Sequence, residues 1–295
     1  AGGIVWDRAA VPPALQLALH SDSLDLARLY PAHRAGPSAP DVKGDARVFP
    51  DTPFPPVKLP GLAIQADLRA ERLVLPNGLE LGAVQLRGSS NAERIDVAQL
   101  DFGLARGHFN LAGGWQQGVG SAAPRVTAQV KARGVALDAL LALMRREAVI
   151  SGGRTEVDAR LSASGHSPRR LASSLDGEVR IRVGEASSAG RRSSSSSVPG
   201  ELVSALLHAL TPLRSEGDSF KVRCAAARLP IKAGRIDIDR SIAIEGERVD
   251  VVMSGLIDLA GERVDLGMRP TVKKGTGLDP SAFAGVVKVA GPLAA

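Results

Sequence analysis

Alternation of apolar and polar residues with a period of two is the feature that most limits what this chain can fold into. In a strand, successive side chains point to opposite faces of the sheet, so each alternating run has one apolar and one polar face. Such runs predict antiparallel strands that are covered on one side only. The alternating runs are Leu62–Ala70, Leu100–Leu104, Val126–Val130, Val157–Leu161, Val179–Val183, Ile236–Asp239, Ile242–Glu245, Val249–Val251 and Val264–Met268.

Turn signals separate these runs and favour a meander over βαβ units. Gly and Pro together supply many breaks, with 32 and 19 residues respectively, and glycine-containing pairs are typical of tight turns between strands. The expected turns are Pro76-Asn77-Gly78, Arg106-Gly107, Ala233-Gly234, Glu245-Gly246-Glu247 and Ala260-Gly261-Glu262. The sequence therefore predicts a mainly β fold with a few short helices.

Three segments break the alternation and predict helices. Val135–Arg146 carries leucines at helical spacing and ends on two arginines, and Ser167–Leu175 opens with Pro168 in its first turn. Val198–Leu213 has the longest apolar stripe, so we expect it to be the longest or second-longest helix. A helix this apolar favours packing into a core over docking on a membrane.

The chain also shows a repeat and two linker-like segments. An alternating run followed by a Leu-Asp pair occurs at Leu24-Asp25 and again at Leu137-Asp138, which predicts repeated sheet segments capped by small helices. Residues 35–60 are rich in proline and predict an extended connector. Residues 187–197 are rich in serine and predict a flexible loop rather than a modification target.

Composition narrows the classes of partner. The formal net charge is +6, from arginines spread along the chain, and aromatic residues make up only 3%. Dispersed positive charge attracts anionic surfaces, either lipid headgroups or nucleic acid, but few aromatics are present for stacking bases. We therefore expect a solvated basic surface and no nucleic-acid partner. No apolar run approaches the ~18–20 residues of a membrane span.

Catalytic and metal-binding patterns are missing from the sequence. The five histidines stand apart, and no nucleophile elbow or phosphate-binding loop is present. Asp237 and Asp239 share the polar side of one run, where they either act as an acid and base or pair with Arg235 and Arg240 on the surface. Cys224 is expected on the apolar side of its run, as a small core residue rather than a nucleophile. We expect no enzymatic activity, no cofactor and no metal.

The last third of the chain resembles the AsmA family. In that family a strand ends in Gly-x-Gly-x-Ile-Asp-Leu and is followed by a turn and a Leu-Asp-Leu strand. Ser254–Leu259 and Glu262–Leu266 are similar to this pattern, with Met253 where the first glycine often lies. The flanking segments Phe220–Ile236, Ile242–Glu245 and Val249–Met253 also resemble the family, as does Phe49–Pro55 upstream.

The resemblance implies a domain plan and a cellular setting. Residues 1–34 would end an upstream AsmA-like repeat, residues 35–60 would be the connector, and residues 61–295 would form the AsmA-like C-terminal β-rich domain. The resemblance implies a protein of the Gram-negative periplasm, held at the inner membrane by an N-terminal anchor. Because the chain begins at Ala1, we expect that anchor to have been removed. Phospholipid and envelope proteins are the implied partners.

Together the alternation and the resemblance predict a curled, twisted antiparallel sheet that forms a taco-like half-barrel. Three short helices are too few to cover so many strands, so part of the apolar face would line a trough for acyl chains, with a closed sandwich as the alternative. The predicted role is non-catalytic handling of phospholipid in outer-membrane biogenesis. The alternative role is a structural or interaction factor that assists envelope assembly without carrying lipid. The candidate residues of the lipid groove are Ile236, Ile238, Ile242, Ile244, Val249 and Val251.

Overall fold

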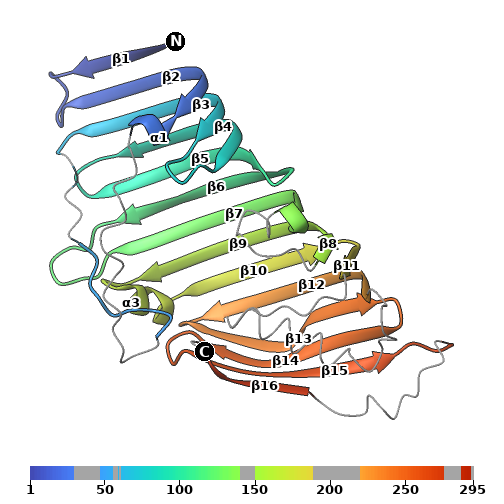
Figure 1. Cartoon of the computed structure of the whole chain (residues 1–295). Coiled ribbons are helices and arrows are strands. Elements are labelled where there is room, and N and C mark those ends of the chain that lie inside the picture. Colours follow the sequence, from blue (N-terminus) through green and yellow to red (C-terminus); the bar gives the residue numbers. More distant parts are fainter. Residues whose placement is uncertain are drawn as a thin grey trace.

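The protein forms one long β-sheet, seen here in a computed structural model (Figure 1). The structure describes residues 1–29, 47–55, 59, 61–139, 150–188, 220–275 and 287–293. Sixteen strands make up the sheet, and two short helices lie beside it. The mainly β class and the antiparallel pairing predicted from the alternation are therefore confirmed. The sheet shows no strong curl over its length.

Most strands follow one another along the sheet in chain order. Within the described residues, the one parallel pairing joins β2 to β3, and the other neighbours are antiparallel. The strands of the main path are β1 (Gly2–Asp7), β2 (Ala14–Asp25), β3 (Ala63–Val74), β4 (Glu80–Ser90), β5 (Arg94–Leu104), β6 (Gly107–Gln116), β7 (Arg125–Ala136), β9 (Arg154–Ser164), β10 (Asp176–Val183), β12 (Phe220–Lys232), β13 (Arg235–Gly246), β14 (Val249–Asp258), β15 (Arg263–Val272) and β16 (Val287–Pro292). Two short strands, β8 (Ile150–Gly152) and β11 (Ala186–Ser188), pair with each other beside β12.

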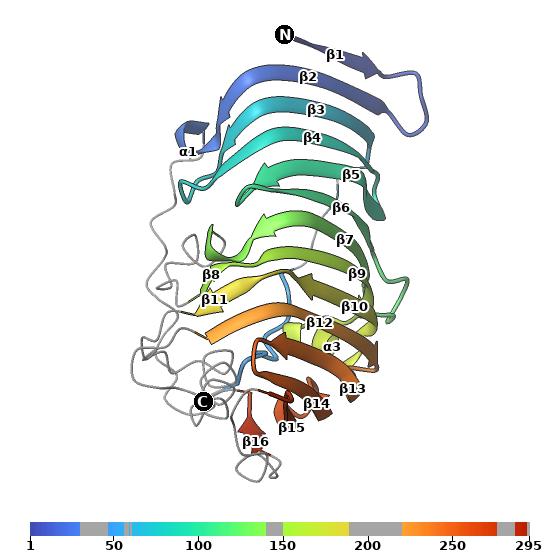
Figure 2. The same ribbon diagram turned by 90° about the vertical axis from the view of Figure 1, so that its right-hand side faces the viewer.

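Side by side, the strands bow along their length, as Figure 2 shows for β2 to β10. Three of the five predicted turns lie wholly between consecutive strands, whereas Gly107 already belongs to β6 and Glu245-Gly246 still belongs to β13. Residues 1–25 and 63–74 stand on opposite sides of the proline-rich segment in the sequence, yet β2 and β3 are direct neighbours in the sheet.

The helices agree with the sequence in part. α3 (Pro168–Ser173) begins at the predicted proline, and the Ser167 hydroxyl caps it by accepting the Arg170 N–H at 3.3 Å. The helix expected from Val135 starts later, because Val135 and Ala136 continue β7; residues 137–139 are helical. Residues 140–149 and the expected helix Val198–Leu213 lie outside the described residues. α1 (Leu26–Leu29) follows β2, as the repeat predicts.

One expectation about the strands is wrong. Ile236–Asp239 and Ile242–Glu245 are not separate strands, since both belong to β13. An irregularity between Ile238 and Ile242 interrupts the pairing with β14, and Arg240 adopts a positive φ of 51° there. In the sequence, the residues between Ile238 and Ile242 look like a turn. In the structure, the backbone does not reverse there, and β13 continues as a bulged strand.

Residues 47–55, which we call the strap, cross the end of the sheet near α3. The Glu262 carboxylate, in the turn between β14 and β15, accepts the N–H groups of Val48 and Phe49 at 2.9 and 3.1 Å. Further along the strap, the Ser167 hydroxyl donates to Asp51 at 2.7 Å, and the Phe54 N–H donates to the His166 carbonyl at 2.7 Å. The strap therefore ties the last hairpins to the start of α3.

Candidate functional site

The strand register gathers apolar side chains on one side of the sheet, which we call the apolar face. Residues that pair directly across strands share a face. One row of such pairs runs from β2 to β12 and is apolar at every position. It comprises Leu19, Leu68, Leu86, Leu100, Leu111, Val130, Ala159, Val179 and Leu229.

The opposite side, the polar face, carries charges that largely pair with one another. The matching row here is Arg69, Gln85, Asp101, Asn110, Lys131, Asp158, Arg180 and Arg228. Glu178 lies next to this row, paired with Arg228 at 2.7 Å and also with Arg180. The hydrogen bond from Arg228 is the main reason that the pKa of Glu178 is lowered. The middle of the polar face is therefore an ordinary solvated surface, and the larger feature that needs an explanation is the apolar face.

Exposure of the apolar face changes along the sheet. From β3 to β7, the large side chains of the row, from Leu68 to Val130, are only partly buried. In the C-terminal strands, Val249, Val251, Leu266 and Met268 expose 2% or less of their surface. The face is thus covered at its C-terminal end, whereas over β3 to β7 the row itself is partly exposed. A second cluster of buried residues, Ala70, Leu81 and Val84, lies beside the row in β3 and β4.

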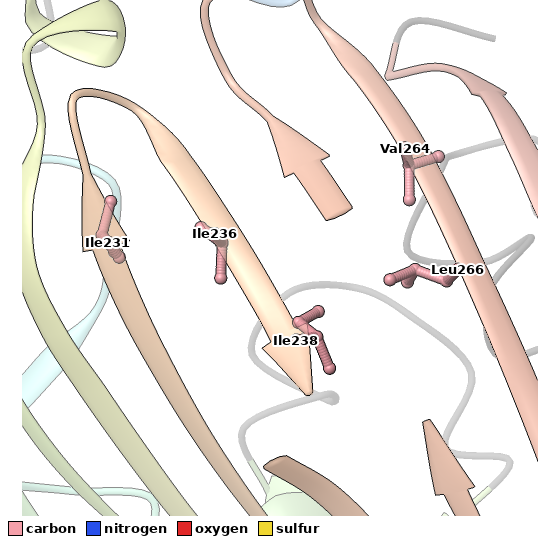
Figure 3. Close-up of a cluster of buried hydrophobic side chains, with 5 residues drawn as sticks. All are labelled: Ile231, Ile236, Ile238, Val264 and Leu266. Atoms are coloured by element: carbon pink, nitrogen blue, oxygen red, sulfur yellow. The ribbon is translucent and has the colours of Figure 1, made fainter. Parts of the chain in front are cut away.

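A compact hydrophobic cluster accounts for part of the covered end (Figure 3). Ile231 and Ile236 pair across β12 and β13, and Val264 and Leu266 reach them from β15. Ile238 and Leu266 flank Gly255, which pairs with both. Because Gly255 has no side chain, the residues on the strands to either side of β14 can pack together.

The six residues expected to line a lipid groove divide by exposure. Ile236, Ile238, Val249 and Val251 are buried, whereas Ile242 and Ile244 are only partly buried. The register puts Ile236, Ile242 and Ile244 opposite Ile257, Met253 and Val251, all on the apolar face.

The accessible part of the face contains none of the candidates chosen from the sequence. Its residues come from β3 to β7, whereas the candidates come from the C-terminal strands, where the family resemblance is densest. The alternation in Leu62–Ala70 and Val126–Val130 carries the necessary signal. The exposure of these side chains, by contrast, depends on what packs over the strand, and the alternation of the strand's residues does not show it.

Cys224 is on the polar face, so the prediction of a core cysteine is wrong. A register shift between Val222 and Cys224 changes which side chains face the apolar side, and Cys224 pairs with Glu245. The Cys224 thiol lies 3.6 Å from a Glu245 carboxylate oxygen. Partial desolvation, and then the hydrogen bond to Glu245, raise the pKa of Cys224.

Glu245 is itself the centre of a small charge cluster. Lys273 and Arg223 approach its carboxylate at 3.1 and 3.2 Å, and Lys273 also pairs with Asp250 at 3.1 Å. The hydrogen bond from Lys273 is the largest cause of the lowered pKa of Glu245. A thiol with a raised pKa beside a carboxylate is a poor nucleophile.

The two aspartates singled out in the sequence, Asp237 and Asp239, show no catalytic arrangement. Asp239 is 97% exposed at its side chain and lies 3.9 Å from Arg240, and Asp237 is also exposed. Across the described ranges, no group of three or more His, Cys, Asp or Glu residues is placed to hold a metal ion. Nor does any helix in those ranges have the length and apolarity to span a membrane.

Comparison with known proteins gives one match. Searches of the curated proteins and of the solved structures find no similar protein. The model of the AsmA family matches residues 6–239, which include β2 to β12 and the accessible part of the apolar face. The motif at Ser254–Leu259, on which the sequence resemblance rested, lies beyond the matched residues. Since the match covers most of its 295 residues, the chain belongs to the AsmA family.

Proposed function

We propose that this chain is a non-catalytic envelope protein that holds phospholipid acyl chains on its apolar face. AsmA family membership implies a role related to envelope and outer-membrane biogenesis and a location in the bacterial cell envelope. AsmA family proteins are generally non-catalytic. The observation that carries the proposal is the row of large, partly exposed apolar side chains from Leu68 to Val130.

A continuous apolar surface of this kind needs a partner. Contact with water costs about 25 cal/mol per Å² of apolar area, so soluble proteins rarely leave long apolar strips uncovered. Acyl chains suit this strip because they need apolar contact along their length and no polar partner. Ile242 and Ile244, which are partly buried, remain proposed lipid contacts, and the four buried candidates would support the wall beneath them.

The shape of the groove, the cellular location and the further partners belong to the same proposal. The bowed strands of Figure 2 support a groove, so the taco-like half-barrel is retained as the proposed lipid-bound shape. We place the protein in the periplasm, with an inner-membrane anchor in the full-length protein and envelope proteins as further partners. A structural factor that carries no lipid is the competing function.

Two measurements test the proposal. Phospholipid extracted from the purified protein should be detected by mass spectrometry. A photo-crosslinking amino acid at Val130 should then capture phospholipid, whereas the same residue at Gln129 should not, because Gln129 lies next in the strand but on the polar face. Equal capture at both positions would indicate non-specific adsorption. No capture and no extracted lipid would favour the structural factor.

A further inference from the structure

A second feature lies on the polar side of the sheet, at one end of β5, β6 and β7. Arg94 begins β5, Gln116 ends β6 and Arg125 begins β7, and the three are direct neighbours across the sheet. They line a hollow of about 310 Å³ together with Gly114, Trp115 and Thr127. We call this the rim hollow.

The chemistry of the rim hollow fits an anion. Two guanidinium groups, from alternate strands whose backbones lie about 9–10 Å apart, can both reach a group placed between them. Arg94 is held at 2.9 Å by Asp96, while Arg125 makes no ion pair with any residue in the described part of the chain. The Gln116 amide and the Thr127 hydroxyl add neutral donors, and the Asp96 carboxylate, which pairs with Arg94, lies beside Gly114.

Glycine at position 114 keeps the hollow open. A Cβ atom there would come within 3.1 Å of an Asp96 carboxylate oxygen and 3.8 Å of the Thr127 hydroxyl. The absent side chain thus leaves room beside the Asp96 carboxylate, between the two strands that carry the arginines. Guanidinium groups beside such a space are well suited to the tetrahedral oxygens of phosphate.

Trp115 connects the rim hollow to the apolar face. It lines the hollow, and the register puts it opposite Ile95 and Val126 on the apolar face. Tryptophan is typical of boundaries where one end of a ligand is apolar and the other is wet. Arg94, Gln116 and Arg125 share the polar face, so a lipid whose acyl chain lies on the apolar face would pass around this strand end to place its phosphate in the hollow.

We infer that the rim hollow binds the phosphate of a lipid headgroup. This inference rests on the proposed function, because the acyl chains of the same lipid would lie on the apolar face. Free inorganic phosphate has the same chemistry, so the experiment must separate the two sources.

The test compares phosphatidylglycerol with diacylglycerol, each carrying the same photoreactive acyl chain, on the full chain. The parent should capture phosphatidylglycerol in preference to diacylglycerol. Arg125→Gln should weaken phosphatidylglycerol binding about five- to tenfold, as expected for loss of a charge-assisted contact, and leave diacylglycerol binding unchanged. Arg94→Gln should act in the same direction. Arg160→Gln is the matched control, because Arg160 is exposed on the same polar face but does not line the hollow.

Each other result has a distinct meaning. Equal capture of the two lipids by the parent, or an equal loss in Arg160→Gln and Arg125→Gln, would overturn the headgroup site and leave acyl-chain binding intact. Inorganic phosphate that binds the parent but not Arg125→Gln, without any lipid preference, would assign the hollow to free phosphate and also overturn the inference. Failure to capture either lipid would overturn the proposed function, and the headgroup site with it.

Discussion

At the scale of single residues, Glu262 combines a buried carboxylate with an unfavourable backbone conformation. The residue is only 8% exposed, and its backbone has a positive φ of 51°. The burial of the carboxylate is tolerated because it accepts two backbone N–H groups of the strap. A buried carboxylate without such donors would be costly to the fold.

Removing that carboxylate should loosen the strap. Glu262→Ala leaves the Val48 and Phe49 N–H groups without their acceptors, so we expect unfolding free energy to fall by about 1–3 kcal/mol. Urea denaturation measures this loss, and limited proteolysis should show faster cleavage in the strap. Glu247→Ala, in the exposed turn before β14, is the control and should change stability by less than about 0.5 kcal/mol. Equal stability of the two variants would contradict the anchoring role of Glu262.

Cys224 supplies a pH-dependent prediction. Because its pKa is raised, the thiolate fraction near neutral pH is smaller than for an ordinary cysteine, and alkylation by iodoacetamide should be slow. Replacing Glu245 by Gln removes a negative charge that favours the protonated thiol. The pKa should then fall toward its ordinary value, and alkylation at a fixed neutral pH should speed up. A rate–pH profile for the parent and Glu245→Gln checks the direction, and a shift to higher pH in the variant would contradict it.

Exposure of Cys224 also changes the expected cost of substitution. Because Cys224 is exposed, Cys224→Ser does not bury a hydroxyl, and its effect on stability should stay within about 0.5 kcal/mol. Loss of lipid capture with unchanged stability in this variant would reveal a role that the structure does not explain.

At the scale of elements, two glycines let neighbouring strands pack closely. Gly177 in β10 lies between Leu161 and Ile231, and Gly255 in β14 lies between Ile238 and Leu266. Each has a φ of +143°, and an added Cβ would come within about 2 Å of a carbonyl oxygen on the next strand. A glycine that allows close packing of its two neighbouring strands therefore occurs twice in the C-terminal half of the apolar face.

Alanine at these positions should be poorly tolerated. Gly255→Ala combines an unfavourable φ with a backbone clash, so we expect a loss of at least about 2 kcal/mol in unfolding free energy. Gly177→Ala should behave alike. Gly82→Ala, near the start of β4, is the control, because a Cβ added there would meet nothing within 4 Å and the φ of Gly82 is not positive. Thermal melting of the three variants measures the difference, and a Gly255→Ala protein as stable as Gly82→Ala would refute the packing argument.

How far the sequence predicts these elements depends on local regularity. Alternation correctly indicated β3, β7 and β15, whose residues keep a period of two. It failed at Cys224, where a register shift reverses the faces, and between Ile238 and Ile242, where a bulge looks like a turn. β4 was not anticipated, since Gly82, Ala83 and Gly88 interrupt its apolar pattern. Bulges are stabilised by partners on the next strand, and a single strand's sequence does not contain those partners.

At the scale of the whole molecule, the apolar face joins an accessible region to a closed core. The sequence predicted that such a face exists, because alternation recurs in strands along the whole chain. It did not predict where the face is covered, since Leu111 and Val251 both lie on the apolar face but only Val251 is fully buried. Burial is decided by contacts between β12, β13 and β15, which are distant in the sequence from β3 to β7.

The difference in burial between the closed core and the accessible region can be tested by introducing one aspartate at a buried position and one at a partly buried position. Val251→Asp puts an ion in a site that is 1% exposed and should abolish cooperative folding. Ile244→Asp, opposite Val251 but only partly buried, should melt closer to the parent and mainly lose phospholipid crosslinking. Melting and crosslinking are measured side by side. Collapse of both properties in Ile244→Asp would extend the closed core to this position, and a stable parent that never crosslinks would favour the structural factor.

The strap has a consequence for the order in which the chain can assemble. Its bonds to Glu262 join residues 213 and 214 positions apart, so they close one of the longest loops available to the chain. Closing such a loop costs entropy that nearby hairpins do not incur, and contacts of high sequence separation slow folding. During synthesis, residues 47–55 emerge long before the turn that receives them. We therefore expect the hairpins from β3 onward to form first. The Val48–Phe49 end of the strap should dock last, only after β14 and β15 have left the ribosome.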